Sequence, residues 1–357
     1  MMTGKLSFVS DYMEGAHPQI LNRLTETNLV KSAGYGFDEY SESAREKIRN
    51  ACGVPEADVF FLAGGTQANA VLIDALLRPY QGVISAQSGH INVHEAGAIE
   101  YGGHKVLALP HQDGRITADS IQSCIDDYWQ DENHEHMVMP GMVYISQPTE
   151  YGTLYSLDEL SRISKVCREN NIPLYLDGAR LAYALACPEN DVSLTDLGRL
   201  CDAFYIGGTK CGALFGEAVV IPRHNYISHL FTIIKQHGAL LAKGRIAAIQ
   251  FDTLFTDNLY SEIGKNAIDC ADRIRAALTA GGYALTLHSP TNQIFITLEK
   301  EQAKSLSEKI EMGFIENIDP DHMVMRIATS WATRKEDVDA LIDVLHSSRS
   351  FTKNVRT

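Results

Sequence analysis

Short apolar runs alternate with stretches of helical periodicity through the first 245 residues of the chain. The apolar runs predict seven β-strands, at Val59 to Leu62, Val83 to Ser85, Lys105 to Leu109, Met142 to Ser146, Pro173 to Leu176, Ala203 to Ile206 and Ala218 to Ile221. The stretches between the runs predict helices, for example at Thr66 to Leu77, Ile116 to Tyr128 and Ser156 to Asn170. Strands that alternate with helices favour an α/β fold, in which helices wrap a mainly parallel seven-stranded sheet.

The pattern changes after residue 245. A long helical pattern begins at Arg245 and continues through Phe255 to Ala280. The sequence then predicts strands at Thr286 to His288, Ile294 to Leu298 and Val324 to Ile327, and helices at Glu301 to Met312 and Lys335 to Ser347. We therefore expect an N-terminal arm at residues 1–14, a large domain at 15–245 and a smaller C-terminal α+β domain at 246–357.

The composition narrows the range of partners. The 357 residues carry a formal net charge of −14, which argues against a protein that binds nucleic acid. The longest apolar runs are far shorter than the roughly 20 residues that a bilayer crossing needs, so we expect no membrane span. The seven cysteines show no C-x-x-C pair or other zinc spacing, and no export signal is visible. We expect reduced thiols in a cytoplasmic protein.

Residues 60–70 read FFLAGGTQANA, in which a predicted strand meets Gly64 and Gly65 and a helix opens at Thr66. A helix N-terminus beside glycines offers backbone N–H groups and a positive dipole end to a phosphate. The same letters also fit a tight turn in which Thr66 caps the helix and binds no ligand. The spacing matches neither G-x-G-x-x-G nor a P-loop, so neither a dinucleotide nor a nucleoside triphosphate is favoured.

Two further strand ends carry charged side chains. Asp177 and Arg180 follow the strand in IPLYLDGAR, and Lys210 follows the strand in AFYIGGTKCGA. Ligands of open α/β sheets bind beyond the carboxyl ends of the strands, which is where these side chains belong. A lysine among small residues that is partly desolvated beside another cation loses its proton readily and can form a Schiff base. The alternatives are a capping role for Asp177 and ordinary solvent exposure for Lys210.

The segment AQSGHINVHEAG places His90 and His94 four residues apart, followed by Glu95. This spacing suits two ligands of a metal ion on one helical face, but H-E-x-x-H is absent and no third ligand suggests itself. We therefore expect no metal. His90 after Gly89 could instead lie flat against an aromatic ring.

Taken in order, these motifs resemble the low-specificity threonine aldolases of the β-eliminating lyase family. That family belongs to the aspartate-aminotransferase-like enzymes of fold type I, which use pyridoxal 5′-phosphate (PLP). The resemblance runs from about Phe8 to Val344. Its most specific parts are SDYMEGAHPQIL at residues 10–21, the Tyr35-Gly36 pair, GGTQAN, SGHINVHEAGA, LDGARLAYAL and GGTKCG.

The resemblance implies which residues bind the cofactor. Lys210 would hold PLP through a Schiff base, Asp177 would pair with the pyridine nitrogen, and His90 would stack on the ring. Gly65 and Thr66 would bind the phosphate. A carboxylate beside the pyridine nitrogen keeps that nitrogen protonated, which lets the ring accept the electrons of a bond broken at Cα.

Other residues would bind the substrate or approach the cofactor from elsewhere. By the same resemblance, Ser10, Arg180 and Arg326 would hold the carboxylate of an amino acid, and Tyr35 would join them as a substrate-binding residue. Arg180 would also contact the cofactor. Lys235, in IIKQHG, falls where the family places a basic residue of the neighbouring subunit near the phosphate. Because family members form dimers with shared active sites and commonly tetramers, the resemblance implies a homodimer or homotetramer.

The implied reaction is retro-aldol cleavage of L-threonine, L-allo-threonine or another β-hydroxy-α-amino acid to glycine and an aldehyde. The chain departs from the family at one position. Many members carry a histidine that assists at the β-hydroxyl, whereas this segment reads ISQPTEYGT and offers Glu150. Burial could raise the pKa of Glu150 enough for it to act as the base, or Glu150 could hold a water molecule that does so, and His90 and His94 remain competitors. β-Elimination, transamination and a non-catalytic PLP-binding protein remain as alternatives.

Overall fold

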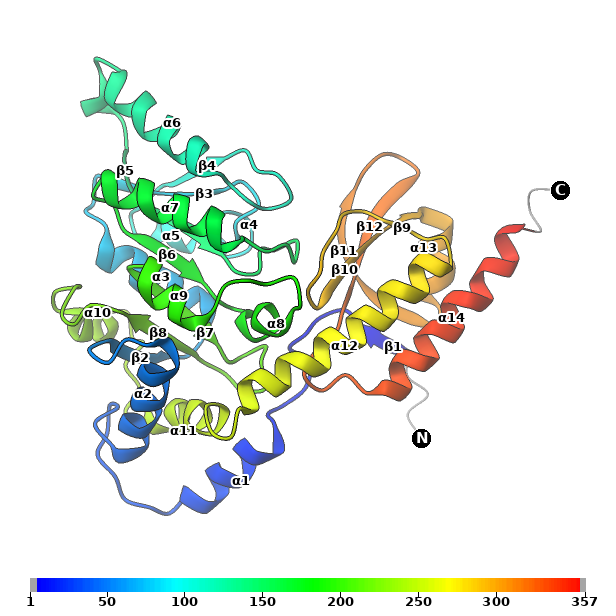
Figure 1. The fold of residues 1–357 in the computed structure, drawn as a ribbon, viewed down its shortest axis with the longest axis horizontal. Coiled ribbons are helices and arrows are strands. Elements are labelled where there is room, and N and C mark those ends of the chain that lie inside the picture. Colours follow the sequence, from blue (N-terminus) through cyan, green and yellow to red (C-terminus); the bar gives the residue numbers. More distant parts are fainter. Residues whose placement is uncertain (1–4, 354–357) are drawn as a thin grey trace.

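A computed structural model of the protein describes residues 5–353, which form two sheets with their covering helices (Figure 1). The larger sheet has seven strands in the order β2-β8-β7-β6-β5-β3-β4. Their bounds are β2 (Asp58–Leu62), β3 (Gln81–Ala86), β4 (Val106–Leu109), β5 (Met139–Ser146), β6 (Leu174–Asp177), β7 (Ala203–Gly207) and β8 (Glu217–Ile221). β8 runs antiparallel to both of its neighbours, and the other pairings are parallel. The expected α/β fold with a mainly parallel seven-stranded sheet is confirmed.

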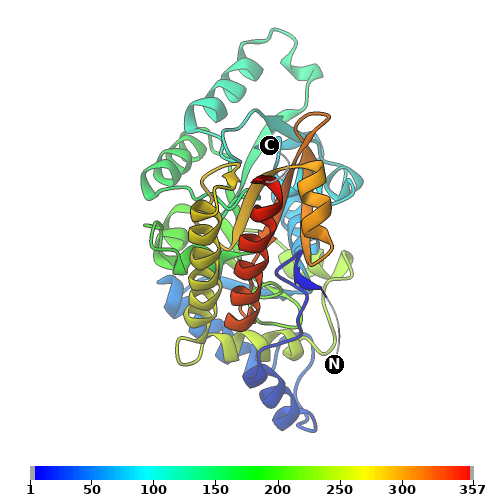
Figure 2. The ribbon, with the colours of Figure 1, turned by 90° about the vertical axis from the view of Figure 1, so that its right-hand side faces the viewer.

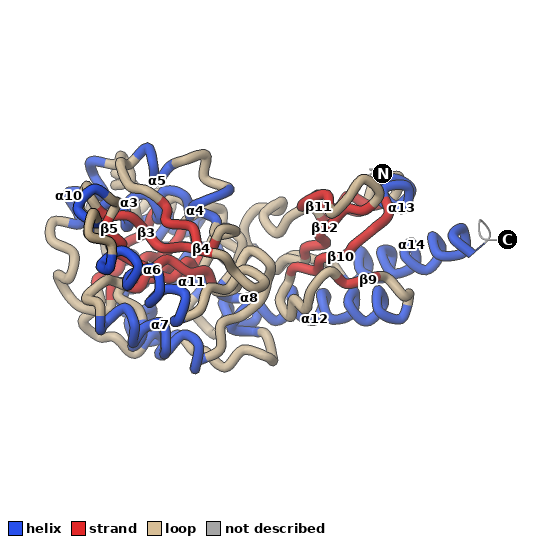
Figure 3. Tube along the Cα trace, turned by 90° about the horizontal axis from the view of Figure 1, so that it is seen from above, coloured by secondary structure: helices blue, strands red, loops and turns tan. Residues whose placement is uncertain are grey.

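Helices cover both faces of this sheet (Figure 3). One face packs against α1 (Pro18–Thr27), α2 (Glu39–Cys52), α6 (Ala118–Gln130), α7 (Leu157–Glu169), α8 (Leu181–Ala186), α9 (Leu194–Leu200) and α11 (Arg245–Leu254). The other packs against α3 (Gly65–Leu76), α4 (His90–Val93), α5 (Ala98–Tyr101) and α10 (Leu230–Gln236). Because both faces are buried, the strands read as nearly continuous apolar runs, which is why the sequence predicts all seven.

Local signals begin several of these helices. The side chains of Thr117, Ser156 and Ser193 accept hydrogen bonds from the backbone N–H three residues on, at the starts of α6, α7 and α9. In each case the residue three positions later bonds back to the cap, which satisfies two otherwise unpaired donors. For α6 and α7, the observed bounds lie within two residues of the predicted ones.

The second sheet has five strands in the order β1-β11-β12-β10-β9. Their bounds are β1 (Leu6–Phe8), β9 (Ala284–Leu285), β10 (Gln293–Glu299), β11 (Ile310–Asn317) and β12 (His322–Ala328). Three helices accompany it: α12 (Leu259–Ala280), α13 (Lys300–Ser307) and α14 (Lys335–Lys353). Figure 2 shows α12 and α14 side by side over this sheet, and their apolar residues form a separate core with β10 and β12.

Three expectations for this half are wrong in detail. The helix predicted at residues 301–312 ends at Ser307, and Ile310–Asn317 is a strand. The strand predicted at residues 286–288 lies at Ala284–Leu285 instead. The long helical pattern is interrupted after Leu254, where Asp257 and Asn258 adopt positive φ angles that a helix cannot continue through.

The predicted arm contributes one strand, β1, to the second sheet. β1 pairs in parallel with β11, and residues 1–4 lie outside the described residues. α11 packs against α1 and α2, whereas α12 runs from the first sheet to the second. The division of the chain at residues 14 and 245 stays a prediction.

Within residues 5–353, no helix combines the length and the apolar character that a bilayer crossing requires.

Gly264 lets α12 approach α8 closely, next to the predicted site residue Arg180. A Cβ atom at Gly264 would lie 2.1 Å from the backbone oxygen of Ala182. We expect Gly264→Ala to lower the free energy of unfolding by about 1–3 kcal/mol, because the helices must separate. Urea-induced unfolding measures this change. Gly15→Ala, where a Cβ atom meets nothing within 4 Å, is the control. Equal stability of the two variants would contradict the proposed close packing.

Candidate active site

Most of the predicted site residues meet beyond the carboxyl ends of the parallel strands. A cavity of about 320 Å³, the first cavity, is lined in part by Gly65, Thr66, His90, Glu150, Asp177, Arg180 and Lys210. A second cavity of about 670 Å³ shares His90, Glu150, Arg180 and Lys210 with the first and adds Arg326. The two cavities therefore adjoin, at the place where open α/β sheets bind their ligands.

The start of α3 offers free backbone donors to the first cavity. The residue that caps this helix is Gly64, with φ −175°, and no side chain caps it. Ala63 N–H donates to Gln67 Oε1 over 3.0 Å, which holds the turn. The helix N-terminus at Gly65 and Thr66 therefore presents N–H groups and a positive dipole end to an anion in the cavity.

Lys210 follows β7 in a tightly closed turn. Gly208 N–H donates to Gly216 O over 3.0 Å, and Tyr183 Oη donates to Lys210 O over 2.5 Å. Burial, and then the nearby Arg180 guanidinium, lowers the pKa of the Lys210 ammonium. A lowered pKa increases the neutral fraction of the amine, which is the form that attacks a carbonyl group.

The Asp177 carboxylate ends β6 and accepts four hydrogen bonds. Oδ1 accepts from Tyr205 Oη at 2.5 Å and from Ala179 N at 2.9 Å. Oδ2 accepts from Tyr144 Oη at 2.7 Å and from Asn69 Nδ2 at 3.2 Å. Burial raises the pKa of both tyrosines well above the ordinary value, so their hydroxyl groups remain protonated donors. These donors hold a buried carboxylate at the wall of the first cavity.

His90 is anchored from behind by a buried acid. Its Nδ1 lies 2.7 Å from Glu95 Oε1, and Asn69 Nδ2 donates to the same oxygen over 2.6 Å. Glu95 therefore links His90 to Asn69, which also contacts Asp177. The His90 and His94 rings lie 5.7 Å apart between centroids. Within residues 5–353, no three His, Cys, Asp or Glu side chains are grouped to hold a metal ion.

Glu150 lines both cavities. Its Oε1 accepts from the backbone N–H of His90 at 2.9 Å and from Ser146 Oγ at 2.8 Å. Burial raises the pKa of Glu150, and the negative charge of Asp177 adds to that rise. A carboxylate with a raised pKa is a stronger base, so Glu150 can accept a proton from a group bound between the cavities.

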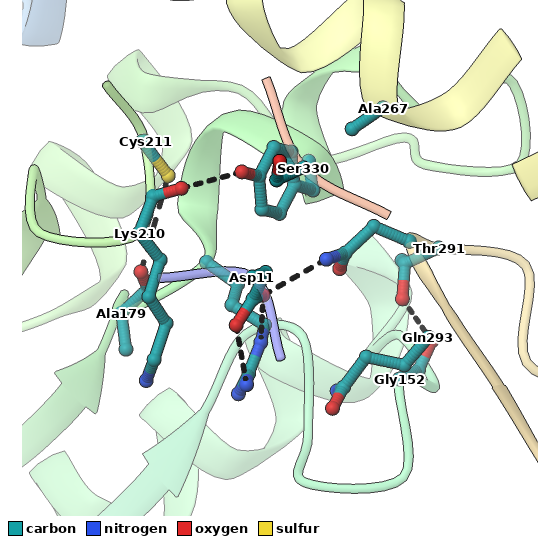
Figure 4. A network of polar contacts seen from close by, with 12 residues as sticks. Asp11, Gly152, Ala179, Lys210, Cys211, Ala267, Thr291, Gln293 and Ser330 are labelled. Atoms are coloured by element: carbon teal, nitrogen blue, oxygen red, sulfur yellow. Dashed lines mark hydrogen bonds and ion pairs between the residues drawn. The ribbon is translucent and has the colours of Figure 1, made fainter. Parts of the chain in front are cut away.

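Arg180 forms a two-point ion pair with Asp11. Arg180 Nε lies 2.6 Å from Asp11 Oδ2, a second contact of 3.0 Å joins Nη2 to Oδ1, and Asn292 Nδ2 also donates to Asp11 at 2.9 Å. Although burial alone would raise it, the Arg180 guanidinium lowers the pKa of Asp11 to about 2. Figure 4 shows Asp11 between Lys210 and the segment with Thr291. The contact ties residues before α1 to the end of β6.

Arg326 lines the second cavity from β12, whereas Ser10 precedes Asp11 in the segment before α1 and lines neither cavity. Arg326 donates through Nη1 to Gln293 Oε1 at 2.9 Å and through Nη2 to Val9 O at 3.0 Å. Its Nε and the Ser10 hydroxyl are buried without a hydrogen-bond partner among the described residues. Unpaired buried donors are costly, so both positions favour an acceptor supplied by a ligand.

Two predicted residues lie apart from this site. Tyr35 lines a third cavity of about 470 Å³ together with Phe37, Phe231 and Leu241. Lys235 Nζ lies 4.8 Å from the centroid of the Tyr35 ring. Within one chain, neither side chain lines the two cavities of the active site. Their predicted roles remain predictions.

The sequence does not reveal the residues that position the predicted site residues through hydrogen bonds. Tyr144 and Tyr205 lie inside continuous apolar runs, which assign them to the core. Asp11 and Asn69 gave no signal, because their partners Arg180 and Asp177 are distant in sequence. Glu95 was noted only as a neighbour of His94.

Removing the charge of Asp11 tests the ion pair. We expect Asp11→Asn to lower the free energy of unfolding by about 3–5 kcal/mol at pH 7, because Arg180 is left buried without a counter-charge. The pKa of Asp11 is lower in the folded chain than in the unfolded chain, so its stabilisation is complete above about pH 4 and declines toward pH 2. Urea-induced unfolding between pH 7 and pH 3 measures both effects.

The control for this prediction is Asp269→Asn, which removes an exposed partner of Lys265. Such a surface pair contributes little stability. The ion pair would be unimportant if the Asp11 and Asp269 variants were equally stable, or if the deficit of Asp11→Asn did not shrink as the pH fell below about 4.

Comparison with known proteins places this chain in a family. Residues 7–326 match the family model of the beta-eliminating lyases. The low specificity L-threonine aldolase of Pseudomonas aeruginosa is 30% identical over 306 residues, which are 84% of this chain and 86% of the relative. The structure of Leishmania major threonine aldolase superposes with a TM-score of 0.93 at 42% identity, covering 96% of this chain and 99% of that one. An aspartate aminotransferase of Thermus thermophilus, 15% identical with a TM-score of 0.72, shares the fold. The chain belongs to the beta-eliminating lyase family.

Proposed function

We propose that this protein is a PLP-dependent aldolase that cleaves L-threonine, L-allo-threonine or another β-hydroxy-α-amino acid to glycine and an aldehyde. One observation carries the proposal: Lys210, Asp177 and Arg180 meet in one cavity. The relatives named threonine aldolase cover nearly the whole chain, which supports the same reaction.

The residues of the first cavity fit PLP. The uncapped N-terminus of α3 suits a phosphate, and the lowered pKa of Lys210 suits condensation with an aldehyde. The Asp177 carboxylate suits a protonated pyridine nitrogen, and the His90 ring provides a flat surface for the ring of the cofactor. When bound, PLP supplies the aldehyde carbon that binds amino groups and a ring that accepts electrons from a bond at Cα.

The cationic groups orient the substrate. Arg326, which lines the second cavity, has a buried Nε without a partner among the described residues, as has the Ser10 hydroxyl, and Arg180 adds positive charge. A carboxylate held at two points fixes the rotation about the Cα–N bond, and thereby which bond at Cα stands perpendicular to the cofactor ring. In this proposal the bond so placed is Cα–Cβ. The Arg180–Asp11 pair holds the guanidinium in a fixed position for this task.

Glu150 is the proposed base. Its carboxylate would take the proton of the β-hydroxyl as the Cα–Cβ bond breaks and the β-carbon leaves as an aldehyde. The hydrogen bonds from Ser146 and from the backbone of His90 fix the carboxylate between the two cavities. His90 is held through Nδ1 by Glu95, so its role in the proposal is to contact the ring.

A second copy of the chain completes the proposal. Tyr35, Phe37, Phe231 and Leu241 form an exposed apolar surface, the Tyr35 surface, around the third cavity, and Phe37 is 72% exposed. An apolar surface of this kind favours burial against another chain, which would form a homodimer or homotetramer. Lys235 lies on this surface, where it could approach the phosphate of the second copy. The scattered free cysteines support a place in the reducing cytoplasm.

Aldehyde release tests the proposed reaction. With PLP and L-threonine or L-allo-threonine, we expect the wild type to release acetaldehyde and Lys210→Ala to release none above background, because Lys210 is the only lysine among the described residues that line the first cavity. A coupled alcohol dehydrogenase assay measures the aldehyde. Persistence of activity in Lys210→Ala would refute the site. A pyridoxamine form that accumulates instead, without aldehyde, would indicate transamination.

Glu150→Gln tests the base. We expect the rate of cleavage to fall by about 10²–10⁴, since the amide cannot accept the proton of the hydroxyl. The wild-type rate should fall as the pH drops through the raised pKa of Glu150, and this acid limb should be absent from the residual activity of the variant. Initial rates between pH 5 and pH 9 give both results. Glu56→Gln, at an exposed glutamate, is the control. An unaltered rate and pH profile would move the role to a histidine or to water.

A further inference from the structure

One buried acid at the first cavity has no part in the reaction proposed above. Glu217 is the first residue of β8, is only 3% exposed, and lines the cavity together with Lys210 and Asp177. A carboxyl group in such a place requires partners or a proton. The position of Glu217 in the sheet indicates which groups surround its carboxyl group.

Glu217 lies between the two Gly-Gly-Thr segments of the chain. β8 runs antiparallel between β2 and β7, and Glu217 is paired with Leu62 on one side and Gly207 on the other. The segment after Leu62 leads to Gly64, Gly65 and Thr66 at the start of α3. The segment after β7 leads through Gly208 and Thr209 to Lys210. Glu217 therefore stands beside both the proposed phosphate site and the turn that carries the lysine.

Its carboxylate is bonded to the second of these segments. Glu217 Oε2 accepts from Gly208 N–H at 3.1 Å, and Oε1 accepts from Thr209 Oγ1 at 2.9 Å. Thr209 Oγ1 also accepts from Gly216 N–H at 3.0 Å. The carboxyl group thus holds the start of the loop from residue 208 to residue 216, and Thr209 joins that start to the end of the loop at Gly216. These contacts fix the place from which Lys210 enters the cavity.

The buried position of Glu217 favours its neutral form. Burial raises the pKa of Glu217 to about 8, and the charge of Asp177 contributes to the rise, whereas the Thr209 bond and Lys210 act against it. The other titratable groups that act on Glu217 or respond to its charge come from β6, β7, the loop after β7 and α12, and are Tyr175, Tyr205, Cys211 and Tyr260. A phosphate dianion at the start of α3 would add further negative charge.

We propose that Glu217 is a positioning residue of the cofactor site that carries a proton whenever the cofactor phosphate is bound, so that phosphate binding is coupled to proton uptake. This inference rests on the PLP site proposed above. A buried carboxylate beside a bound phosphate would repel it, whereas a carboxylic acid can donate a hydrogen bond to a phosphate oxygen or to Thr209. The same side chain then holds the Lys210 turn in both states.

The coupling has a definite sign. Below about pH 8 the free site already holds the proton, so binding of the phosphate does not depend on Glu217. Above that pH the proton must be taken up on binding, so the dissociation constant rises, by up to tenfold for each pH unit. A glutamine at position 217 is neutral at every pH and removes this dependence.

Calorimetry with two ligands tests the coupling in the full chain freed of cofactor. Pyridoxamine 5′-phosphate carries the phosphate but lacks the aldehyde that reacts with Lys210, and pyridoxamine lacks the phosphate as well. Ring and amine titrations are common to both ligands, so the ratio of their affinities isolates the phosphate. For the wild type, we expect the association constant of pyridoxamine 5′-phosphate divided by that of pyridoxamine to fall at least fivefold between pH 8 and pH 9.5. For Glu217→Gln, we expect the ratio to change less than twofold over the same pH range. Glu56→Gln serves as the matched control and should behave like the wild type.

Proton uptake gives an independent measurement on the wild type, which remains valid if the variant does not fold. Titrations near pH 9 in two buffers of different ionisation enthalpy should show uptake with pyridoxamine 5′-phosphate beyond that with pyridoxamine. Equal uptake with the two ligands, or equal pH dependence in wild type and Glu217→Gln, would overturn the role of Glu217 while leaving the PLP site intact. Failure of the wild type to bind either PLP or pyridoxamine 5′-phosphate would overturn the proposed function as well.

Discussion

The site is organised around a negative charge buried at the end of β6. A carboxylate such as Asp177 cannot remain ionised away from water unless hydrogen bonds replace the water. Four donors do so here, and they come from α3, β5, β7 and the turn after β6. The tyrosines serve because burial keeps their hydroxyl groups protonated. The strands must therefore keep their register if these donors are to stay within hydrogen-bond distance of Asp177. The same register positions the neighbouring residues of the site.

A second buried charge pair joins the two sheets. Asp11 lies after β1 of the smaller sheet, and Arg180 lies after β6 of the larger one. Asn292, just before β10, contacts the same carboxylate. Arg326 comes from β12 and donates to the backbone of Val9. The proposed substrate-binding groups thus come from both sheets, and the ion pair holds the two sheets at a fixed separation. A displacement of either sheet would change the geometry of the carboxylate site.

The sequence predicts the strands of the large sheet and the chemistry at their ends because both signals are local. Strands buried on two faces give apolar runs, and glycines with charged residues mark the turns that follow. Lys210, Asp177 and Arg180 could therefore be singled out from the sequence. β11 could not, because half of its side chains face solvent and its start continues the periodicity of α13.

The partners of the site residues could not be predicted for a different reason. Tyr144 has the residue type of a core strand, and only the fold brings its hydroxyl to Asp177. Asp11 and Arg180 are 169 residues apart in the chain, and one sequence contains no signal for a pairing at such a distance. Glu95 and His90 are only five residues apart in the chain, but the contact between their side chains depends on the turn after α4. Recognition of a family supplies roles for individual residues, whereas these contacts belong to the three-dimensional arrangement.

The acids of the site illustrate how environment assigns chemistry to one functional group. Asp11 faces a guanidinium, which lowers its pKa to about 2 and makes it a permanent counter-charge. Glu150 has neutral donors and a neighbouring carboxylate, so burial raises its pKa and suits it to accept protons. Glu217 is buried between two segments of backbone, and its pKa rises to about 8. One acid is therefore fixed in charge, one exchanges a proton during the proposed reaction, and one retains its proton until the pH is alkaline. The separation follows from which groups face each carboxyl, so it can be maintained only as long as the two sheets and their connecting turns keep their places.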